Sequence, residues 1–405
     1  MIGIAQRALI DVVTWLPLIS VVITAHEMGH FWMARVFGIA IERFSLGFGR
    51  ALISWRDKAG TEWRIGWIPV GGYVKFAGDE NVASVPDEQD LKTLRAEIIA
   101  AEGPGAELKY FAFKPVWQRA LVAAAGPLAN FVLAVVIFAI LLGTLGADLI
   151  LPKIGRVLPG SAAEKAGFRA GDLVVQADAR RIDSFEQLAT YVTVRGNAPI
   201  DFIVERGGQR VSLIATPTEK LETKGFNAGR HAGALGIESS PTRDSYKHVT
   251  YDPISALEGG VSQTWDILST TTYYLGRLVT GQVSADQLGG PLRVAQMSGA
   301  MATAGAQSVP DLPTKVFAVL VNLIQLAAFV SVSIGFVNLM PIPVLDGGHL
   351  LFYAYEAVAR RPLAEAVQAA SYRVGLALLL GLMLFATTND LLHSSVFHFL
   401  GGLFS

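Results

Sequence analysis

The chain contains no cysteine and few charged residues, and each shortage excludes something. Without cysteine there can be no disulfide, and any metal site must use histidine and carboxylate ligands rather than thiolates. Charged residues make up only 17% of the 405 residues, whereas 52% are hydrophobic; a soluble globular protein carries about 25% charged residues. The formal net charge of −1 gives no basis for nucleic-acid binding. This composition indicates a membrane protein with water-exposed inserts.

Four long apolar stretches predict transmembrane helices, because roughly 20 apolar residues are needed to cross a bilayer. The stretches cover residues 8–34, 120–147, 316–345 and 367–387. The first lacks a basic leader and a clear small-residue cleavage site, so we interpret it as a retained helix rather than a signal peptide. Lys and Arg gather between the first two stretches and between the last two, which places these loops in the cytoplasm and both termini outside.

His26, Glu27 and His30 form an H-E-x-x-H motif inside the first apolar stretch. Residues i and i+4 share one face of a helix, so both imidazoles can bind one ion, and Glu27 can act as the general base. Two unrelated surface histidines beside a carboxylate would be the alternative interpretation. Ionisable groups within a span are costly, which argues against that alternative.

A catalytic zinc usually has three protein ligands, so the motif needs a partner from elsewhere in the chain. Asp346 is the preferred candidate, because it follows the third span, whose end lies on the same side as the end of the first span. His349 is a competing ligand. Pro341 and Pro343 are expected to break the third helix, which indicates a hydrated cavity. Zinc is inferred from the ligand types, which also suit other divalent ions.

Two sets of residues are candidates for substrate binding. Asn338 and Asn130, on the third and second spans, could hydrogen-bond a substrate backbone or could join helices to one another. The pattern of residues 41–76 predicts a β-hairpin region at the membrane. The last segment of this region could bind an extended substrate by strand addition. A purely structural hairpin is the alternative. The residues of that edge are Gly71, Gly72, Tyr73 and Val74.

Between the second and third spans the sequence predicts an external insert. Residues 150–240 form an α+β domain whose two helices begin at capping boxes. Residues 241–312 form an external linker with an amphipathic helix at 252–281, which lies either on the membrane surface or on the insert. The expected strands cover residues 154–158, 172–177, 200–206, 210–215 and 234–238. The flanking membrane halves cover residues 1–147, which include a short cytoplasmic helix at 90–101, and 313–405.

Together these motifs resemble the site-two protease family of intramembrane zinc metalloproteases, in its bacterial RseP-like branch. The resemblance implies that His26, His30 and Asp346 bind Zn²⁺ and that Glu27 is the catalytic base. It also implies that the β region presents substrate. The segments that carry it are HEMGH at 26–30, GGYVKF at 71–76, AAGPLANF at 124–131 and NLMPIPVLDGGH at 338–349.

The insert resembles a PDZ domain in circularly permuted form, since the strand that would open such a domain comes last, near residues 233–237. Enterobacterial relatives carry two such domains, whereas this sequence shows one. The family implies a bacterial inner-membrane enzyme whose active site is near the cytoplasmic side. Its substrates are single-span membrane proteins, such as anti-sigma factors first cut outside by a site-one-type protease, or remnant signal peptides.

Two other functions are alternatives to a protease. An inactive membrane scaffold that uses its PDZ domain to bind partners would not need three ligands and a base, and this sequence has all four residues. A metal transporter could use intramembrane histidine and aspartate, but transporters usually contain internal repeats, and the two membrane halves show none. The sequence therefore favours an intramembrane zinc endopeptidase.

Overall fold

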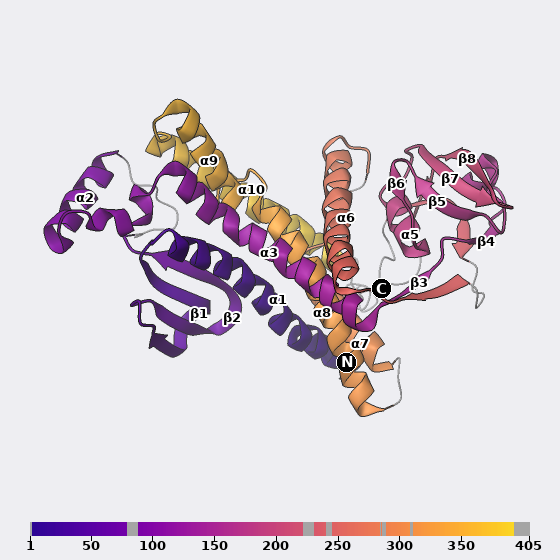
Figure 1. The fold of residues 1–405 in the computed structure, drawn as a ribbon, viewed down its shortest axis with the longest axis horizontal. Coiled ribbons are helices and arrows are strands. Elements are labelled where there is room, and N and C mark those ends of the chain that lie inside the picture. The colour runs from indigo at the N-terminus through magenta and orange to yellow at the C-terminus, as the bar shows by residue number, and fades with distance from the viewer. Residues whose placement is uncertain are drawn as a thin grey trace, which may run out of the picture. The chain divides into compact units, whose positions relative to one another are not determined.

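The structure, a computed structural model, describes residues 2–78, 88–221, 231–239, 245–283, 285, 289–307 and 311–392. Its internal contacts divide the chain into two compact units. The membrane unit contains residues 1–138 and 290–388, and the inserted unit contains residues 139–289 together with the chain from 389 onward. Figure 1 shows the elements of both units, which are described separately below.

Four helices within the described residues are long and apolar enough to cross a membrane. Many of their large apolar side chains are exposed, as lipid-facing side chains would be. This confirms the four predicted spans and makes the chain a polytopic membrane protein. The helices are α1 (Ile2–Val36), α3 (Val116–Leu145), α8 (Leu312–Asn338) and α10 (Glu365–Leu392).

The third span ends earlier than predicted. It was expected to reach residue 345, but α8 ends at Asn338 and a separate helix, α9 (Asp346–Ala359), begins after a turn. Pro341 and Pro343 have no amide N–H and disfavour helical geometry in the residue before them. The helix therefore stops before the prolines, and Asp346 is the first residue of a new helix.

The interval predicted as a single linker, residues 241–312, is divided between the units. Its first helix, α6 (Pro253–Val279), belongs to the inserted unit, whereas α7 (Pro291–Gln307) packs on α1 and α8 in the membrane unit. Small side chains on α7 allow this close packing, and Ser298 forms a 2.9 Å hydrogen bond with Thr14 of α1. No apolar pattern predicts α7, because alanine, glycine and serine lower the contrast between its hydrophobic and polar faces.

Two long strands, β1 (Ile41–Arg56) and β2 (Glu62–Phe76), form the β-structure predicted after the first span. Residues 43–46 of β1 pair with residues 62–65 on one side and with residues 72–75 on the other. This double pairing is possible because β2 changes direction at Gly71, whose φ of 90° favours glycine. The segments follow the order 53–56, 62–65, 43–46 and 72–76 across the sheet.

A short helical region lies between this sheet and α3. The helix predicted at residues 90–101 is present as α2 (Glu88–Glu102), and two 3₁₀ turns follow it, η1 (Ala106–Lys109) and η2 (Phe111–Phe113). The part of the predicted cytoplasmic loop at residues 79–87 lies outside the described residues.

The inserted unit is an α+β domain built around a four-stranded antiparallel sheet in the order β6-β5-β7-β8. Three further strand pairs join β3 to β12, β4 to β11 and β9 to β10. The strand expected at residues 234–238 is interrupted by Gly236, which has a φ of 79°. The elements are β3 (Ala147–Ile150), β4 (Ile154–Val157), α4 (Ala162–Ala166), β5 (Leu173–Ala177), β6 (Arg180–Arg181), α5 (Phe185–Thr193), β7 (Ile200–Arg206), β8 (Gln209–Ala215), β9 (Thr218–Leu221), β10 (His231–Ala234), β11 (Ile237–Ser239) and β12 (Tyr246–Val249).

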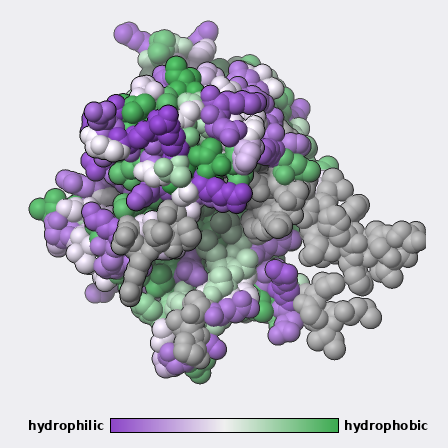
Figure 2. Space-filling view, turned by 90° about the vertical axis from the view of Figure 1, so that its right-hand side faces the viewer, coloured by the Kyte–Doolittle hydropathy of each residue, from purple (hydrophilic) through white to green (hydrophobic). Residues whose placement is uncertain are grey.

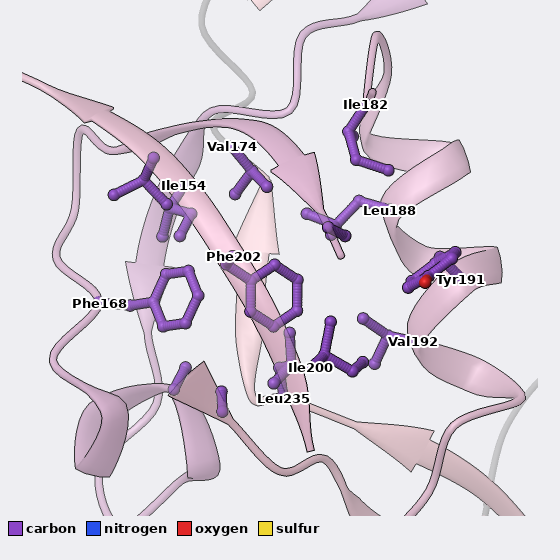
Figure 3. Packing of buried hydrophobic residues seen from close by; sticks show 14 of the residues in the cluster. Ile154, Phe168, Val174, Ile182, Leu188, Tyr191, Val192, Ile200, Phe202 and Leu235 are labelled. Atoms are coloured by element: carbon purple, nitrogen blue, oxygen red, sulfur yellow. The ribbon is translucent and has the colours of Figure 1, made fainter. Parts of the chain in front are cut away.

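One hydrophobic core holds this unit together. Phe168 and Phe202 meet edge to face with ring centroids 5.3 Å apart, and Leu188 and Val192 of α5 pack against the same cluster (Figure 3). The two predicted helix caps are present, because Ser161 and Ser184 each accept a backbone N–H in the first turn of the helix that follows. The face of the unit seen in Figure 2 mixes hydrophilic and hydrophobic residues, as a water-exposed surface does.

The amphipathic helix α6 is attached to the insert at its C-terminal end. Arg277 is buried and donates hydrogen bonds to the carbonyls of Val194 and Gly196, at 3.0 and 2.6 Å. The guanidinium of Arg195 stacks over the ring of Tyr273 at 3.9 Å. Of the two placements predicted for this helix, packing on the insert is therefore present in the structure.

Candidate metal centre

His26, His30 and Asp346 come together in the membrane unit, although 316 sequence positions separate His30 from Asp346. The two histidines lie one turn apart on α1, and Asp346 begins α9. Their ligand atoms all lie within 4.8 Å of one another. The Nε2 atoms of the histidines are 3.2 Å apart, and Asp346 Oδ2 is 3.1 Å from the first and 3.5 Å from the second.

These separations match the dimensions of a tetrahedral metal site. Zinc binds nitrogen and oxygen at about 2.0–2.1 Å, so ligand atoms at tetrahedral angles lie roughly 3.3 Å apart. The three observed separations, 3.1, 3.2 and 3.5 Å, bracket that value. Two histidines and one carboxylate also leave a fourth position open, as a catalytic zinc site requires.

The hydrogen bonds around the three side chains indicate a cation among them. His30 Nδ1 lies 2.8 Å from the carbonyl of Val122, which can only accept, so Nδ1 carries the proton and Nε2 presents a lone pair. That lone pair faces His26 and the carboxylate of Asp346. Asp346 Oδ2 is buried and makes no hydrogen bond of acceptable geometry despite its short separations. A proton on Nε2 of His26 would satisfy only one of these contacts, whereas a bound cation would satisfy all of them at once.

Helix α3 packs closely behind the two histidines, and two glycines make this possible. A Cβ atom at Gly126 would overlap the ring of His30 and would lie 2.9 Å from Cε1 of His26. A Cβ atom at Gly29 would overlap the carbonyl oxygen of Ala125. The backbones of α1 and α3 are therefore nearly in contact where the ligands lie, and neither glycine can be enlarged without moving the helices apart.

Glu27 lies between the ligand set and the edge of the sheet. A Cβ atom at Gly72 would be only 3.2 Å from Cγ of Glu27, and the backbone of Val74 lies near the Glu27 carboxylate. His26, His30 and Asp346 are all near enough to influence its charge. The carboxylate is thus beside the metal-ligand set without being one of the three grouped ligands.

The turn before Asp346 is strained and tightly enclosed. Val344 has a φ of 108°, which is unusual for a β-branched residue and costs on the order of 1–3 kcal/mol. A Cβ atom at Gly375 of α10 would overlap the carbonyl oxygen of Pro343. His349, the competing ligand, is outside the ligand group, and its Nε2 is 3.0 Å from the hydroxyl of Tyr372 on α10.

An ion pair joins α9 to the start of α3. Arg119 donates a 2.6 Å hydrogen bond to Glu356, and both side chains are less than one-fifth exposed. The guanidinium also lies 5.1 Å from the ring centroid of Tyr353. Since α9 carries Asp346 and α3 packs on the histidines, this pair connects the two sides of the ligand set.

The residues predicted to bind substrate lie in different surroundings. Asn130 is completely buried, and its amide is 3.4 Å from Nδ1 of His26. Asn338 is the last residue of α8. The four predicted edge residues lie on the outer segment of β2, beside Glu27; they are Gly71, Gly72, Tyr73 and Val74.

Some residues that shape the centre were not predicted from the sequence. Gly126 and the carbonyl of Val122 were missed, although Gly126 and Asn130 are spaced i, i+4 and so share the face of α3 turned to the histidines. This spacing was a usable signal. The ion pair of Arg119 with Glu356 had no signal, because its partners are 237 positions apart in sequence.

A helix-borne pair of histidines, a carboxylate from a second helix and an adjacent glutamate form a group that could hold a metal ion, as the centre of a membrane metalloprotease requires. A family model described as "Peptidase family M50" matches residues 14–382. The chain belongs to this family, which comprises the site-two proteases, and it is a zinc-dependent membrane protease. The scaffold and transporter alternatives are thereby set aside.

Curated relatives agree with this assignment. Metalloprotease MmpA of Caulobacter vibrioides is 50% identical over 398 residues, which cover 98% of this chain and 99% of that protein. Atu1380 of Agrobacterium fabrum, whose name contains the words zinc metalloprotease, is 43% identical and covers 94% of this chain and 95% of its own length. Regulator of sigma-E protease RseP of Salmonella typhimurium is 30% identical over 472 aligned residues, 92% of this chain and 96% of that protein.

Proposed function

We propose that this protein cleaves single-span membrane proteins within the bilayer, with zinc held by His26, His30 and Asp346. The observation that carries the proposal is the meeting of three ligand atoms, 3.1 to 3.5 Å apart, on helices of a membrane unit. Zinc bound there would act as a Lewis acid toward the scissile carbonyl and the water. The histidines belong to a predicted span, which puts the chemistry at bilayer depth.

Glu27 is the proposed general base. Its carboxylate is placed to take a proton from the attacking water and to deliver it to the leaving amine of the cut peptide bond. The backbone N–H of Val74 is near enough to orient the carboxylate in this proposal. Because the Glu27 carboxylate lies beside the proposed ligands and is not one of them, it is free to transfer a proton.

The edge of β2 at residues 72–76 is proposed to hold the substrate. A helical substrate hides its carbonyl groups, so cleavage requires an extended segment. A strand added beside Val74 would be presented in extended form next to Glu27. The edge and the base are adjacent, because Gly72 has no side chain and lies against the Glu27 methylene group.

The inserted unit is proposed to be a circularly permuted PDZ domain that limits access to the site. Its capped helices, the glycine at 236 and the late strand β11 fit that pattern. The alignment with the Salmonella relative extends over 472 positions, of which 92% of this 405-residue chain fills only a part, so that protein holds segments without a counterpart here. One domain rather than two is consistent with this difference.

The cellular role follows as part of the same proposal. The enzyme lies in a bacterial inner membrane, with both termini and the insert on the periplasmic side and the centre toward the cytoplasm. Its substrates are anti-sigma-factor-like proteins that a site-one-type protease has already shortened, or remnant signal peptides. The lysine and arginine distribution supports the orientation.

The test of the mechanism is Glu27→Gln. The variant should retain one zinc per chain, because Glu27 is not a ligand, and should lose cleavage of a co-reconstituted single-span substrate by about 10²–10⁴-fold or more. His26→Ala is the contrasting variant and should lose both zinc and cleavage. Undiminished cleavage by Glu27→Gln would contradict the assignment of the base.

Strand addition can be tested by disulfide cross-linking, because the chain has no native cysteine. Tyr73→Cys lies on the edge beside Glu27, and Ser54→Cys lies on the opposite edge of the same sheet. With Glu27→Gln to prevent cleavage, substrates carrying single cysteines near the cut should cross-link to position 73 and not to position 54. Equal cross-linking at both positions would exclude this edge as the binding site.

A further inference from the structure

The side chain of Asn130 faces the metal-ligand set from behind His26. It is completely buried on α3, and its Nδ2 atom is 3.4 Å from Nδ1 of His26. The other nitrogen of the same ring, Nε2, is 3.2 Å from Nε2 of His30 and 3.1 Å from Oδ2 of Asp346. The hydrogen bond of Asn130 to Nδ1 therefore decides which ring nitrogen carries the proton, and so whether Nε2 has a lone pair for a metal.

A neutral imidazole carries one N–H and one lone pair. If the amide NH₂ of Asn130 donated to Nδ1 of His26, the ring proton would have to be on Nε2, where it would point at the ligand set and remove the lone pair that a metal needs. If the amide is turned by half a rotation, its oxygen accepts the Nδ1–H and the Nε2 lone pair faces the other ligands. The two orientations have nearly the same shape.

The geometry of the ligand set favours the turned amide. With NH₂ toward His26, the Oδ1 atom of Asn130 is buried and has no hydrogen-bond partner among the described residues. Half a rotation places the NH₂ group there instead, so the number of paired amide groups does not distinguish the two orientations. Only the turned amide accepts the Nδ1–H of His26 and leaves a lone pair on Nε2, which lies 3.1 Å from Oδ2 of Asp346 and 3.2 Å from Nε2 of His30.

We infer that Asn130 is a positioning residue whose amide oxygen holds His26 in the Nδ1–H tautomer. The carbonyl of Val122 does the same for His30 at 2.8 Å. A single helix, α3, thus fixes the ring proton and the orientation of both histidine ligands, one through a side chain and one through its backbone.

The surroundings of Asn130 allow little movement. Ser331 of α8 donates a 2.8 Å hydrogen bond to the backbone carbonyl of Asn130. A Cβ atom at Gly335, also on α8, would lie only 3.2 Å from Cβ of Asn130. The residue is enclosed between α1 and α8 and has no exposed surface. Of the two roles predicted for it, this burial favours a contact between helices over a contact with substrate. The hydrogen bond to His26 gives that contact a specific function.

The inference rests on the proposed ligand set, so the experiment must separate the two. The full-length protein would be purified in detergent without metal, and Zn²⁺ affinity would be measured by competition with a chromophoric chelator. Asn130→Leu removes the acceptor at similar size, Asn130→Asp retains one, and His26→Ala removes the ligand. Selective ¹⁵N-histidine labelling would report the tautomer of His26 in the metal-free protein, and thermal unfolding would report stability.

We expect Asn130→Leu to bind zinc about 10–100-fold more weakly, as loss of a partner behind a metal-binding histidine does. Asn130→Asp should remain within a few-fold of wild type. The ¹⁵N shifts of His26 should indicate the Nδ1–H form in wild type and a change of tautomer in Asn130→Leu.

Three results would overturn the inference: wild-type zinc affinity in Asn130→Leu, equal weakening in the Leu and Asp variants, or an unchanged His26 tautomer with only a lower unfolding temperature. The last result would reduce Asn130 to a contact between helices. If His26→Ala bound zinc like wild type, the ligand set itself would be wrong. If His26→Ala lost zinc and Asn130→Leu did not, only the role of Asn130 would fail.

Discussion

Substitution of Gly126 by alanine would place one methyl group against both histidine rings, and its consequences can be worked out in some detail. The new Cβ would overlap the ring of His30 and lie 2.6 Å from its Cε1, and it would lie 2.9 Å from Cε1 of His26. Favourable carbon–carbon contacts are about 3.5–4.0 Å. The rings, or α1 as a whole, would have to withdraw by roughly 1 Å.

A displacement of that size is large for metal chemistry but modest for folding. Ligand distances in metal sites are held to about 0.2 Å, so a ring displaced by several times that amount no longer completes the tetrahedron. A misplacement of about 1 Å can reduce catalysis by about 10²-fold. Overpacking typically costs about 1–3 kcal/mol, and the better helix propensity of alanine returns up to about 1 kcal/mol. Gly126→Ala should therefore remain folded yet bind zinc poorly.

The assay measures three quantities on purified protein: zinc bound per chain, cleavage of a reconstituted single-span substrate, and unfolding temperature. Gly381→Ala is a matched control, because Gly381 lies on a spanning helix and a Cβ there would meet no atom within 4 Å. The control should keep full zinc and activity. A Gly126→Ala protein with wild-type zinc affinity and cleavage would refute the packing argument.

Three further outcomes follow from other contacts. Arg119→Leu should lower the free energy of unfolding by about 1–3 kcal/mol, because the half-buried Glu356 loses its partner. Replacing Glu356 by Leu as well should recover much of this loss, and a double-mutant cycle measured by chemical unfolding would show it. His349→Ala should keep stoichiometric zinc by metal analysis while Asp346→Ala loses it; the reverse result would make His349 the ligand. Burial opposes ionisation of Asp172, but hydrogen bonds from Arg206 keep the pKa of Asp172 below its usual value. The ionised carboxylate therefore contributes its full stabilisation above about pH 4, the pKa of an unfolded aspartate, and this stabilisation disappears as the pH falls through the lower pKa of the folded state. The protease resistance of the insert in the full-length chain should show this acid-dependent loss, and Asp172→Asn should remove it.

The sequence allowed the spans, the insert and the grouping of His26, His30 and Asp346 to be predicted, because each rests largely on a local pattern. Apolar runs of sufficient length indicate spans, and capping boxes marked α4 and α5 correctly. The ligand pair His26 and His30 is local to one helix. Asp346 could be paired with them because the span that contains the histidines and the span before Asp346 run in the same direction.

One feature was predicted imprecisely, and others depended on tertiary contacts that no local pattern carries. Pro341 and Pro343 were expected to break the third helix, but hydrophobicity extended the span to residue 345, whereas α8 ends at Asn338. Helix α7 was missed because its small residues are useful only against α1 and α8. The role of Asn130 could not be separated from contact with substrate until its burial against His26 was known.

The chain enters and leaves the inserted domain at a single point. Strands β3 and β12 pair along their length, and the N–H of Leu151 donates a 2.8 Å hydrogen bond to the carbonyl of Ser245, which closes the pair. The described residues between these two positions therefore leave and return through a two-stranded stem. A stem of this kind allows the length of the chain between residues 151 and 245 to change without displacing the chain on either side, and the contacts of α6 with residues 194–196 are the further link that such a change would have to preserve.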